Sequence, residues 1–391
     1  MSSKGAVKKV LAATVSASMA LAMFGCSSGA ATQTSSSTSS SASSSEATQS
    51  ATRTVTAADG TQVQIPYEVT KVAPTIGALA EITMIVSNGE PVISAASTQQ
   101  ISDAFKAYFP KYEEGNPNGY SASSVEDIIA SGTQVVYGVS TMFSDDQLQQ
   151  LDEAGVAFVP INSLSTVDDL CNAAELIGDI LGGEAPAQAK KFSTYWKGQL
   201  EEAKQATASV TAKQTIMECM YNSGAFTTIN STDIMNEYFE AAGLVNVTAD
   251  MQQQSQGQGG GQGGSQGGGR GGAQGISLDE EAIAQANPQW IITNSTDGKD
   301  ALMNDEALQS VDAIANDHVL VSPQGAYLWI VRSGEGAMVP MWLVSQIYPD
   351  LAGDYDATAA VKEFFQDYYA DAITDEQAAQ ILAGASSAIS R

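Results

Sequence analysis

Histidine, cysteine and basic side chains are scarce in this sequence of 391 residues, and each scarcity excludes a class of function. His318 is the only histidine, which excludes zinc or manganese sites built on three imidazoles and haem ligation by two histidines. Haem would need tyrosine, methionine or His318, and carboxylate clusters remain conceivable metal ligands. We therefore assign no metal site and expect no intrinsic cofactor.

Motifs of several catalytic classes are missing as well. The cysteines are Cys26, Cys171 and Cys219, which form no C-x-x-C pair, and no G-x-x-x-x-G-K-S/T phosphate loop occurs. His318 begins an apolar strand, a place where a lone histidine is more often structural than catalytic. The sequence therefore predicts a protein that is not an enzyme. A disulfide between Cys171 and Cys219 stays open, although both fit core positions.

Basic charge is also scarce, with 17 Lys and Arg against 44 Asp and Glu and a formal net charge of −27. The only basic cluster, Lys4, Lys8 and Lys9, stands at the N-terminus. Because no Lys/Arg stripe can follow a phosphate backbone, nucleic acid is excluded as a partner. Acidity alone does not identify the true partner.

The N-terminal residues are typical of an export signal. A basic start, MSSKGAVKK, precedes the apolar run VLAATVSASMALAMF and then Gly25-Cys26. This ending resembles the lipobox of bacterial lipoproteins, although Met23 and Phe24 depart from its commoner pattern. The resemblance implies a signal peptide over 1–25, lipidation of Cys26 and an extracytoplasmic protein anchored to the cell membrane. An ordinary cleaved signal or an uncleaved anchor remains the alternative.

Two segments have compositions that cannot bury a core. Residues 26–52 are almost all small and polar, which predicts a tether that holds a folded body off the membrane. Residues 252–275, rich in glutamine and glycine, predict a flexible surface loop inserted into the second half of the chain. A partner-contacting role for this insertion and a neutral expansion both stay open.

One pattern occurs in both halves of the folded body. SSVEDIIASGTQVVYGVS and ISLDEEAIAQANPQWIITNS each open with Ser-x-x-Glu, at Ser123 and Ser277, which predicts a capping box and a short helix. Each helix ends at Gly132 or Asn287, and an apolar strand and a polar loop follow. The pattern predicts one αβ unit present twice, unless two unrelated units coincide.

Further strands are predicted in TKVAPTI, PVISAAS and VAFVPIN of the first half and in QTIMECMYNS and HVLVSPQ of the second. Strands that alternate with helices favour parallel sheets in α/β lobes, where ligands bind beyond the carboxyl ends of the strands. Between the halves, a helix is predicted over 186–208, with one apolar face formed by Ala189, Phe192, Trp196, Leu200 and Ala203. This helix would join an N-terminal lobe (53–185) to a C-terminal lobe (209–391).

These features together resemble the substrate-binding proteins of bacterial ABC importers for iron-siderophores, haem and cobalamin. The resemblance rests on RTVTAADGTQVQIPYEVTKVAPTI, SSVEDIIASGTQVVYG, MNEYFEAAGLVNV and MVPMWLVSQIYPDL, in this order. Leu244 departs from it, since a second glycine is usual there. It implies two Rossmann-like lobes with central parallel sheets, a single long helix between them and a ligand cleft between the lobes.

The resemblance also implies site residues and partners. The loops after the strands supply candidate ligand-binding residues: Thr75, Thr98, Thr141, Met142, Tyr221, Asn294, Tyr327, Trp329 and Arg332. Permease docking is assigned to Glu81 and Glu237. The partners would be an ABC permease and ATPase, with the binding protein itself a monomer.

The ligand implied is a metal chelate, with a ferric siderophore favoured over haem or cobalamin. Two features carry this choice. The ending MVPMWLVSQIYPDL is similar to that of family members that handle iron complexes, and a guanidinium at Arg332 beside Tyr327 and Trp329 suits an anionic or flat ligand. Alternatively, Trp329 is a core residue and Arg332 pairs with Glu335 or another acid. A surface interaction protein on the same fold, without a transporter, is the alternative of another class.

Overall fold

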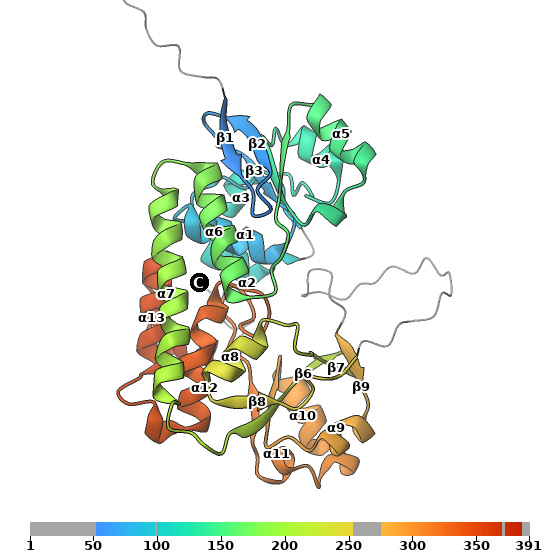
Figure 1. Cartoon of the computed structure of the whole chain (residues 1–391), viewed down its shortest axis with the longest axis vertical. Coiled ribbons are helices and arrows are strands. Elements are labelled where there is room, and N and C mark those ends of the chain that lie inside the picture. Colours follow the sequence, from blue (N-terminus) through green and yellow to red (C-terminus); the bar gives the residue numbers. More distant parts are fainter. Residues whose placement is uncertain (1–51, 98–99, 253–274, 370–371, 385–391) are drawn as a thin grey trace, which may run out of the picture. The chain divides into compact units, whose positions relative to one another are not determined.

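The structure is a computed structural model that describes residues 52–97, 100–252, 275–369 and 372–384 (Figure 1). The predicted signal peptide, Cys26, nearly all of the predicted tether and most of the glycine-rich insertion lie outside these residues. The predictions made for them therefore stay predictions.

An antiparallel hairpin opens the described chain, formed by β1 (Thr52–Thr56) and β2 (Gln62–Pro66). The guanidinium of Arg53 donates to the backbone oxygens of Tyr67 at 3.0 Å, Asp179 at 2.8 Å and Ile180 at 2.6 Å. The last two oxygens belong to the final turn of α6 (Val167–Leu181), where the helix leaves carbonyl groups without helical partners. Arg53 therefore fixes the hairpin to α6.

The N-terminal half contains a three-stranded parallel sheet in the order β3-β4-β5. The segment predicted as a strand from Pro91 makes only single bridges, Ile93 to Val72 and Ala96 to Ser121, at the edge of this sheet. The elements of this half are β3 (Val72–Pro74), α1 (Gly77–Val86), α2 (Asp103–Tyr108), α3 (Tyr112–Gly115), α4 (Val125–Ala130), β4 (Val135–Gly138), α5 (Asp145–Glu153), β5 (Ala157–Pro160) and α6.

The C-terminal half contains a six-stranded sheet in the order β11-β10-β6-β7-β9, with β8 also paired to β6. Its strands are β6 (Gln214–Asn222), β7 (Ala225–Thr228), β8 (Leu244–Asn246), β9 (Ile276–Leu278), β10 (Trp290–Thr293) and β11 (Val319–Val321). The strands β8, β6, β10 and β11 are parallel, as predicted, whereas β7 and β9 are antiparallel additions at one side. Ser223 and Gly224, with φ of 52° and 87°, form the tight turn between β6 and β7.

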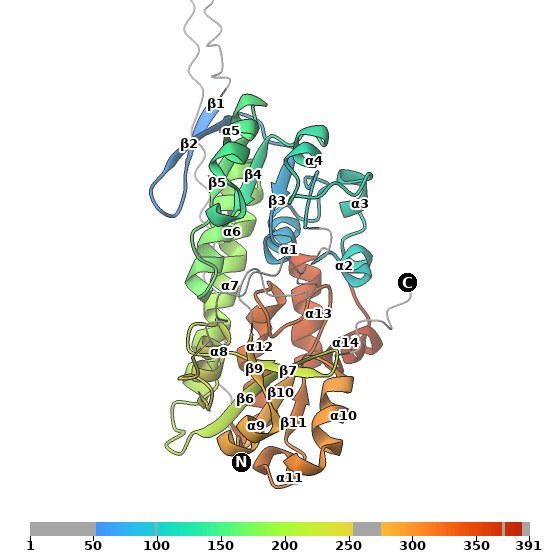
Figure 2. The ribbon, with the colours of Figure 1, turned by 90° about the vertical axis from the view of Figure 1, so that its right-hand side faces the viewer.

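Helices accompany this second sheet and complete the chain (Figure 2). They are α8 (Met235–Ala241), α9 (Glu280–Ala286), α10 (Thr296–Asn304), η3 (Glu306–Leu308), α11 (Asp312–Ala315), η4 (Glu335–Met338), α12 (Val339–Ile347), η5 (Pro349–Leu351), α13 (Ala357–Tyr368) and α14 (Asp375–Leu382). With its parallel sheets and many helices, the chain has the predicted α/β fold class.

The repeated αβ unit is present in both halves, although its predicted caps are wrong. Ser124, not Ser123, caps α4 and accepts from the backbone N–H of Asp127, while Asp279 caps α9. Ser277 lies in β9, where it pairs with Thr227 of β7, two positions before the residue that caps α9. The predicted helix ends are correct, since Gly132 and Asn287 both have positive φ, 73° and 40°.

Each of the two units also has a glutamine directly before its strand: Gln134 before β4 and Gln289 before β10. The side-chain oxygen of Gln134 accepts from the backbone N–H groups of Thr70 at 2.7 Å and Lys71 at 3.0 Å. That of Gln289 accepts from the N–H of Thr215 at 2.9 Å. Both amides extend the pairing of neighbouring parallel strands by one step, β3 with β4 and β6 with β10.

The predicted linker helix is α7 (Ala185–Ala206), which packs beside α6 (Figure 1). The side chains predicted for its apolar face are all buried: Ala189, Phe192, Trp196, Leu200 and Ala203. α7 also packs against α1, α8, α12 and η4, so both halves contact it. The long helix is therefore a packing partner of both halves as well as the chain segment that joins them.

One hydrophobic core runs through both halves. It includes Val72 of β3, Phe192 of α7 and Phe365 of α13. The rings of Tyr108 and Phe365 lie 4.8 Å apart, and those of Phe109 and Tyr369 lie 4.4 Å apart, so α2 and α13 meet through aromatic contacts. Helix α13 therefore joins the halves a second time.

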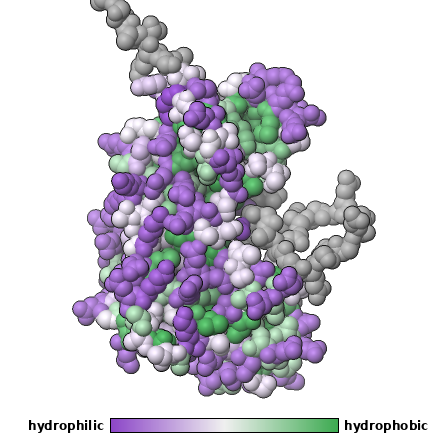
Figure 3. Space-filling model, viewed as in Figure 1, coloured by the Kyte–Doolittle hydropathy of each residue, from purple (hydrophilic) through white to green (hydrophobic). Residues whose placement is uncertain are grey.

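Hydrophilic residues cover much of the face seen in Figure 3, with smaller hydrophobic patches between them. Among the described residues, no helix combines the length and the apolar character that crossing a membrane requires.

Candidate functional site

The predicted ligand-binding residues lie in the loops that follow the parallel strands. These residues differ in burial and in the hydrogen bonds that they already make within the protein. Thr75, directly after β3, is 2% exposed, and its N–H donates to the backbone oxygen of Tyr137 at 3.1 Å. Its hydroxyl packs against Gly138 of the neighbouring strand, where an added Cβ would lie 1.7 Å from Thr75 Oγ1. Within the described chain this hydroxyl has no hydrogen-bond partner.

The loop after β4 is the open one. It forms the short helix η2 (Ser140–Met142), in which Thr141 and Met142 are exposed, Met142 by 42%. Phe143 turns inward and packs its ring against Phe158 at 5.7 Å. Thr98 lies outside the described residues. The loop after β4 therefore exposes Thr141 and Met142, while Phe143 packs into the protein and holds the loop in place.

Tyr221 and Asn294 are brought together in the C-terminal half. The Asn294 side-chain oxygen accepts from the Tyr221 N–H at 2.7 Å, and its nitrogen donates to the Tyr221 carbonyl at 3.0 Å. Asn294 thus continues the pairing of β10 with β6 beyond the last strand residue, and its amide is occupied by backbone. Gly298 lies beside this pair, because a Cβ there would stand 2.9 Å from Tyr221 Cβ. Both predicted residues are half-buried.

The loop 322–336, which we call the carboxylate loop, folds around one buried acid. The Glu335 carboxylate accepts from the N–H of Gly325 at 2.8 Å, the N–H of Tyr327 at 3.1 Å and the indole Nε1 of Trp329 at 2.8 Å. An added Cβ on Gly325 would lie 2.6 Å from Glu335 Oε2, so only glycine fits there. A buried carboxylate satisfies these donors, and the donors in turn stabilise its charge.

Trp329 is therefore a core residue, and its prediction as a ligand contact is wrong. It is fully buried, donates to Glu335 and packs edge-on against Trp342 with ring centroids 6.3 Å apart. Its indole N–H needs a buried acceptor, which explains why a tryptophan stands six positions before a glutamate.

Arg332 is half-buried and lies near Asp233, just before α8. Burial raises the pKa of the Asp233 carboxyl, and the positive charge of Arg332 acts in the opposite direction. Asp233 is thus an acid in the field of Arg332, while the Glu335 carboxylate accepts from Gly325, Tyr327 and Trp329.

Tyr327 connects the carboxylate loop to the N-terminal half. It is half-buried, and its hydroxyl lies so close to Gly77, the first residue of α1, that an added Cβ on Gly77 would stand 2.1 Å away. The side-chain oxygen of Gln100 accepts from the Gly77 N–H at the same place. A residue predicted for the ligand site is thus found where the two halves touch.

Neither predicted docking acid is a free surface charge. Glu81 is fully buried, and its carboxylate accepts from the N–H groups of Gly334 at 2.9 Å and Glu335 at 3.1 Å. Its prediction as a docking residue is wrong, because contacts with the carboxylate loop remove it from the surface. Glu237 is half-buried, and its carboxylate accepts from the Val167 N–H at the start of α6, 3.3 Å away. Burial raises the pKa of the Glu237 carboxyl.

Sequence reasoning considered Glu335 only as a partner of Arg332 and assigned no role to Tyr369. The Tyr369 hydroxyl lies 2.7 Å from Glu335 Oε1 and 2.9 Å from Glu81 Oε1. Burial raises the pKa of both carboxyls, and the proximity of Glu335 adds to the effect on Glu81. The one signal in the sequence was the acid of Ser333-Gly-Glu335-Gly, between two apolar segments.

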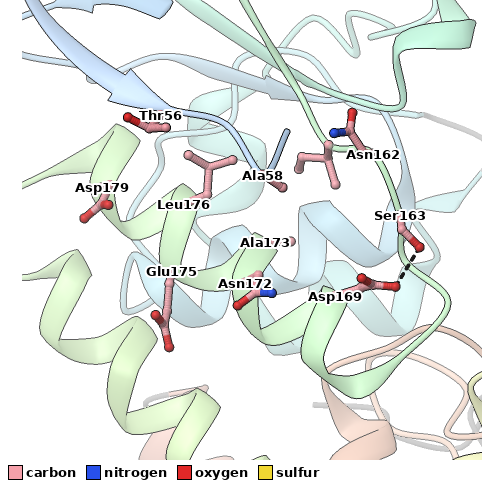
Figure 4. Close-up of a pocket in the computed structure, with 11 residues that line it drawn as sticks. Thr56, Ala58, Asn162, Ser163, Asp169, Asn172, Ala173, Glu175, Leu176 and Asp179 are labelled. Atoms are coloured by element: carbon pink, nitrogen blue, oxygen red, sulfur yellow. Dashed lines mark hydrogen bonds between the residues drawn. The ribbon is translucent and has the colours of Figure 1, made fainter. Parts of the chain in front are cut away.

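A separate pocket of about 530 Å³ lies between the β1–β2 hairpin, the segment after β5 and α6 (Figure 4). Its polar lining includes Asn162, Asp169, Asn172, Glu175 and Asp179. Asp169 already accepts from Ser163 Oγ at 2.6 Å, the hydrogen bond drawn in Figure 4. None of the predicted ligand-binding residues lines this pocket, and no motif signalled it.

No group of three or more His, Cys, Asp or Glu side chains in the described part of the chain could hold a metal ion. Cys171 and Cys219 are free thiols, both buried, at the core positions expected for them. These observations define no resident metal centre among the described residues.

Comparison with known proteins identifies the family. The periplasmic binding protein family model matches residues 118–326, more than half of the chain, and the chain belongs to this family. It is thus an extracytoplasmic solute-binding protein of the class that serves ABC importers, as the sequence segments indicated.

Individual relatives agree with this class. The chain is 23% identical over 301 residues to an uncharacterized ABC transporter substrate-binding lipoprotein of Bacillus subtilis (strain 168), YvrC, covering 75% of this chain and 84% of that one. A periplasmic solute binding protein from Veillonella parvula DSM 2008 superposes with a TM-score of 0.70 at 20% identity, over 85% of this chain and 97% of that chain. The molybdate periplasmic binding protein MolA of Haemophilus influenzae, bound to molybdate, superposes with a TM-score of 0.66 at 18% identity, over 82% and 99%. The superpositions on the Veillonella parvula protein and on MolA show that this chain shares their fold.

Proposed function

We propose that this protein captures a metal chelate, a ferric siderophore in particular, between two lobes and delivers it to an ABC permease and its ATPase. The lobes are residues 53–185 and 209–391, with 186–208 as the linker helix between them. Cys26 carries the lipid that holds the protein at the outer side of the cell membrane, and residues 26–52 form its tether. The protein acts as a monomer.

The single observation that carries the proposal is the position of the carboxylate loop. Tyr327 of this loop reaches Gly77 in the other half, and Arg332, five residues later, is half-buried rather than packed away. One loop therefore offers an aromatic ring and a guanidinium near the place where the halves meet. Stacking and ion pairing with these groups suit an anionic, aromatic chelate.

The remaining ligand contacts are proposed from the loops after the strands. They are Thr75, Thr98, Thr141, Met142, Tyr221 and Asn294. Because the described residues offer no metal cluster, the metal would arrive inside its chelator. MolA, which has this fold, is bound to molybdate, so an anionic metal species is compatible with the architecture.

A titration of the full-length protein with a ferric catecholate siderophore, haem and cobalamin tests the proposal. We expect saturable quenching of tryptophan fluorescence by the siderophore alone. Saturable binding of haem or cobalamin instead would contradict the choice of chelate and leave the importer class in place. No saturable binding of any of the three, together with a partner captured through residues 252–275, would favour a surface interaction protein.

Docking to the permease is proposed for Glu237 alone of the two acids first considered. Its carboxylate is only half-buried, although it already accepts from Val167. If Glu237 docks, Glu237→Gln lowers transport without changing siderophore affinity. Equal loss of both would instead indicate that Glu237 acts through the fold.

A further inference from the structure

Two fully buried carboxylates from opposite halves of the molecule meet at one hydroxyl group. Glu81 lies on α1 of the N-terminal half, and Glu335 begins η4 in the C-terminal half. The oxygen of Tyr369, the residue after α13, lies 2.9 Å from Glu81 Oε1 and 2.7 Å from Glu335 Oε1. Both glutamates have no exposed surface, and Tyr369 has 4%.

Counting hydrogens shows that this arrangement needs an additional proton. A phenol has one hydrogen and can donate it to only one of the two carboxylates. The second contact has hydrogen-bond length, so a carboxyl O–H must donate to the phenol oxygen there. If both acids were ionised, one contact would set lone pairs against each other, and two negative charges would lie buried together. At least one of the two glutamates is therefore protonated.

The remaining hydrogen bonds indicate which acid carries the proton. Glu335 accepts from the N–H of Gly325, the N–H of Tyr327 and the indole of Trp329, whereas Glu81 accepts from two backbone N–H groups. More donors stabilise the charged form better, and the shorter Tyr369 contact, 2.7 Å, is typical of a hydroxyl bound to a carboxylate. The chain of donation therefore runs from the Glu81 carboxyl to Tyr369 and from Tyr369 to Glu335.

The ion pairs found among the described residues include neither Glu81 nor Glu335. Among the described residues, two further tyrosines lie near the pair: Tyr327 of the carboxylate loop, which is in the field of Glu81, and Tyr108 of α2, which packs against the Tyr369 ring. From α7, Phe192 lies over Gly334, so that side is apolar.

We propose that Glu81, Tyr369 and Glu335 form a proton-dependent junction, in which one shared proton holds the carboxylate loop and α13 against α1. With the proton bound, the junction carries a single negative charge surrounded by donors. Without it, two like charges share a dry site, and their repulsion loosens the contact between the halves. Since Tyr327 and Arg332 stand on the carboxylate loop, the proton also governs how firmly these two side chains are held.

The electrostatics of the site agree with this geometry. Burial is the largest cause that raises the pKa of each carboxyl, and for Glu81 the nearby Glu335 raises it further. A carboxyl with a raised pKa keeps its proton near neutral pH and loses it in mildly alkaline solution. The junction is thus closed in acid and weakened in alkali, independently of which ligand the protein captures.

Infrared difference spectroscopy of the full-length protein between pH 6 and pH 9 tests the shared proton directly. Exposed carboxyls are ionised throughout this range. Only a carboxyl whose pKa is raised into the range loses a proton there, and with it the C=O stretching band of the protonated form. We expect the band of a protonated carboxyl at pH 6 that disappears by pH 9. Glu81→Gln removes it, and the exposed-surface control Glu113→Gln leaves it unchanged. Absence of the band in the natural sequence, or its persistence in both Glu81→Gln and Glu335→Gln, would overturn the proposal.

A second measurement needs no variant. The N–H groups of Gly334 and Glu335 donate to Glu81, so their hydrogen exchange reports on the junction. After correction for the intrinsic pH dependence of exchange, we expect their protection to fall at least tenfold between pH 6 and pH 9. The N–H of Thr215, bound to Gln289 far along the chain, serves as the control and keeps its protection. Constant protection at Gly334 and Glu335 would equally rule the proposal out.

Discussion

The loop after β4 and the carboxylate loop after β11 occupy equivalent places, each at the carboxyl end of a parallel strand, yet they differ in almost every physical respect. Thr141 and Met142 in the first are exposed, and the loop is anchored by Phe143. The second surrounds Glu335 and contacts the opposite half through Tyr327 and Glu81. Position in the fold alone thus does not show which side chains of a loop are available to a ligand. In the carboxylate loop, Trp329 and Glu335 are already hydrogen-bonded to groups within the protein.

The largest difference between the two loops should appear when their key side chains are removed. Glu335→Ala leaves the N–H groups of Gly325 and Tyr327 and the indole of Trp329 without a buried acceptor, which destabilises the fold by about 3–5 kcal/mol. Thr141→Ala in the exposed loop changes stability by less than about 0.5 kcal/mol. Urea unfolding of both variants measures this. If both variants lowered the free energy of unfolding by less than about 0.5 kcal/mol, Glu335 would not hold the carboxylate loop together.

The second prediction concerns the pH dependence of stability, which the buried acids at the carboxylate loop should cause and the exposed loop after β4 should not. Glu81 has a pKa raised from 4.5 to about 8, chiefly by burial, so above pH 4.5 the folded protein binds a proton that the unfolded chain releases. Stability is therefore fully present in acid and is lost as pH rises toward 8, by up to about 1.4 kcal/mol per pH unit for one proton.

Unfolding free energies of the natural sequence and Glu81→Gln at pH 5, 6.5 and 8 check this. The variant should have a flatter profile, because the amide does not titrate. A natural-sequence profile that is level or that rises over this range contradicts the assignment.

Gly77→Ala tests the contact between the halves. The added methyl group would meet Tyr327 Oη at 2.1 Å and Gln100 Cβ at 2.7 Å, so Tyr327 must move and stability falls by about 2 kcal/mol. Thermal unfolding measures the change. Gly198→Ala is the matched control, since nothing lies within 4 Å of a Cβ there, and helix propensity should stabilise it slightly.

The double variant Gly77→Ala with Tyr327→Phe sharpens this test. Removing the hydroxyl relieves the closest contact, so the two changes should not add. Additive losses would mean that Tyr327 does not lie against Gly77.

Arg332→Ala gives the smallest expected effect and concerns ligand binding. Loss of the guanidinium should weaken an anionic chelate at least tenfold, about 1.4 kcal/mol, while a neutral analogue of the chelate is affected less. Isothermal titration against the ferric siderophore and its neutral analogue measures both. Unchanged affinity would exclude Arg332 from the ligand site.

Much of the fold could be predicted from local pattern. Apolar spacing correctly identified α7 and its buried face, and Gly132 and Asn287 correctly ended their helices. The capping boxes were wrong because adjacent Ser123 and Ser124 compete for one cap, and Ser277 belongs to a strand whose partner, β7, is distant in sequence. Long periodic segments are therefore more predictable than single caps.

The site was less predictable, and particular residues explain why. Trp329 and Arg332 attracted notice because their residue types are rare, but Trp329 serves Glu335 inside the core. Glu81 was expected on the surface since it stands on a helix, yet α1 is buried on every side. Residue type indicates what a side chain can do, whereas burial decides whether a ligand can reach it.

The sequence by itself determined the α/β class, the long helix, the repeated αβ unit and the solute-binding family, because these depend on periodicity and on segments read in order. Only the tertiary structure decided that Glu81 and Glu335 meet at Tyr369. Glu81 and Gly334, 253 positions apart, are joined by one hydrogen bond. A carboxylate's charge depends on the solvent and the donors around it, and folding supplies both from distant parts of the chain.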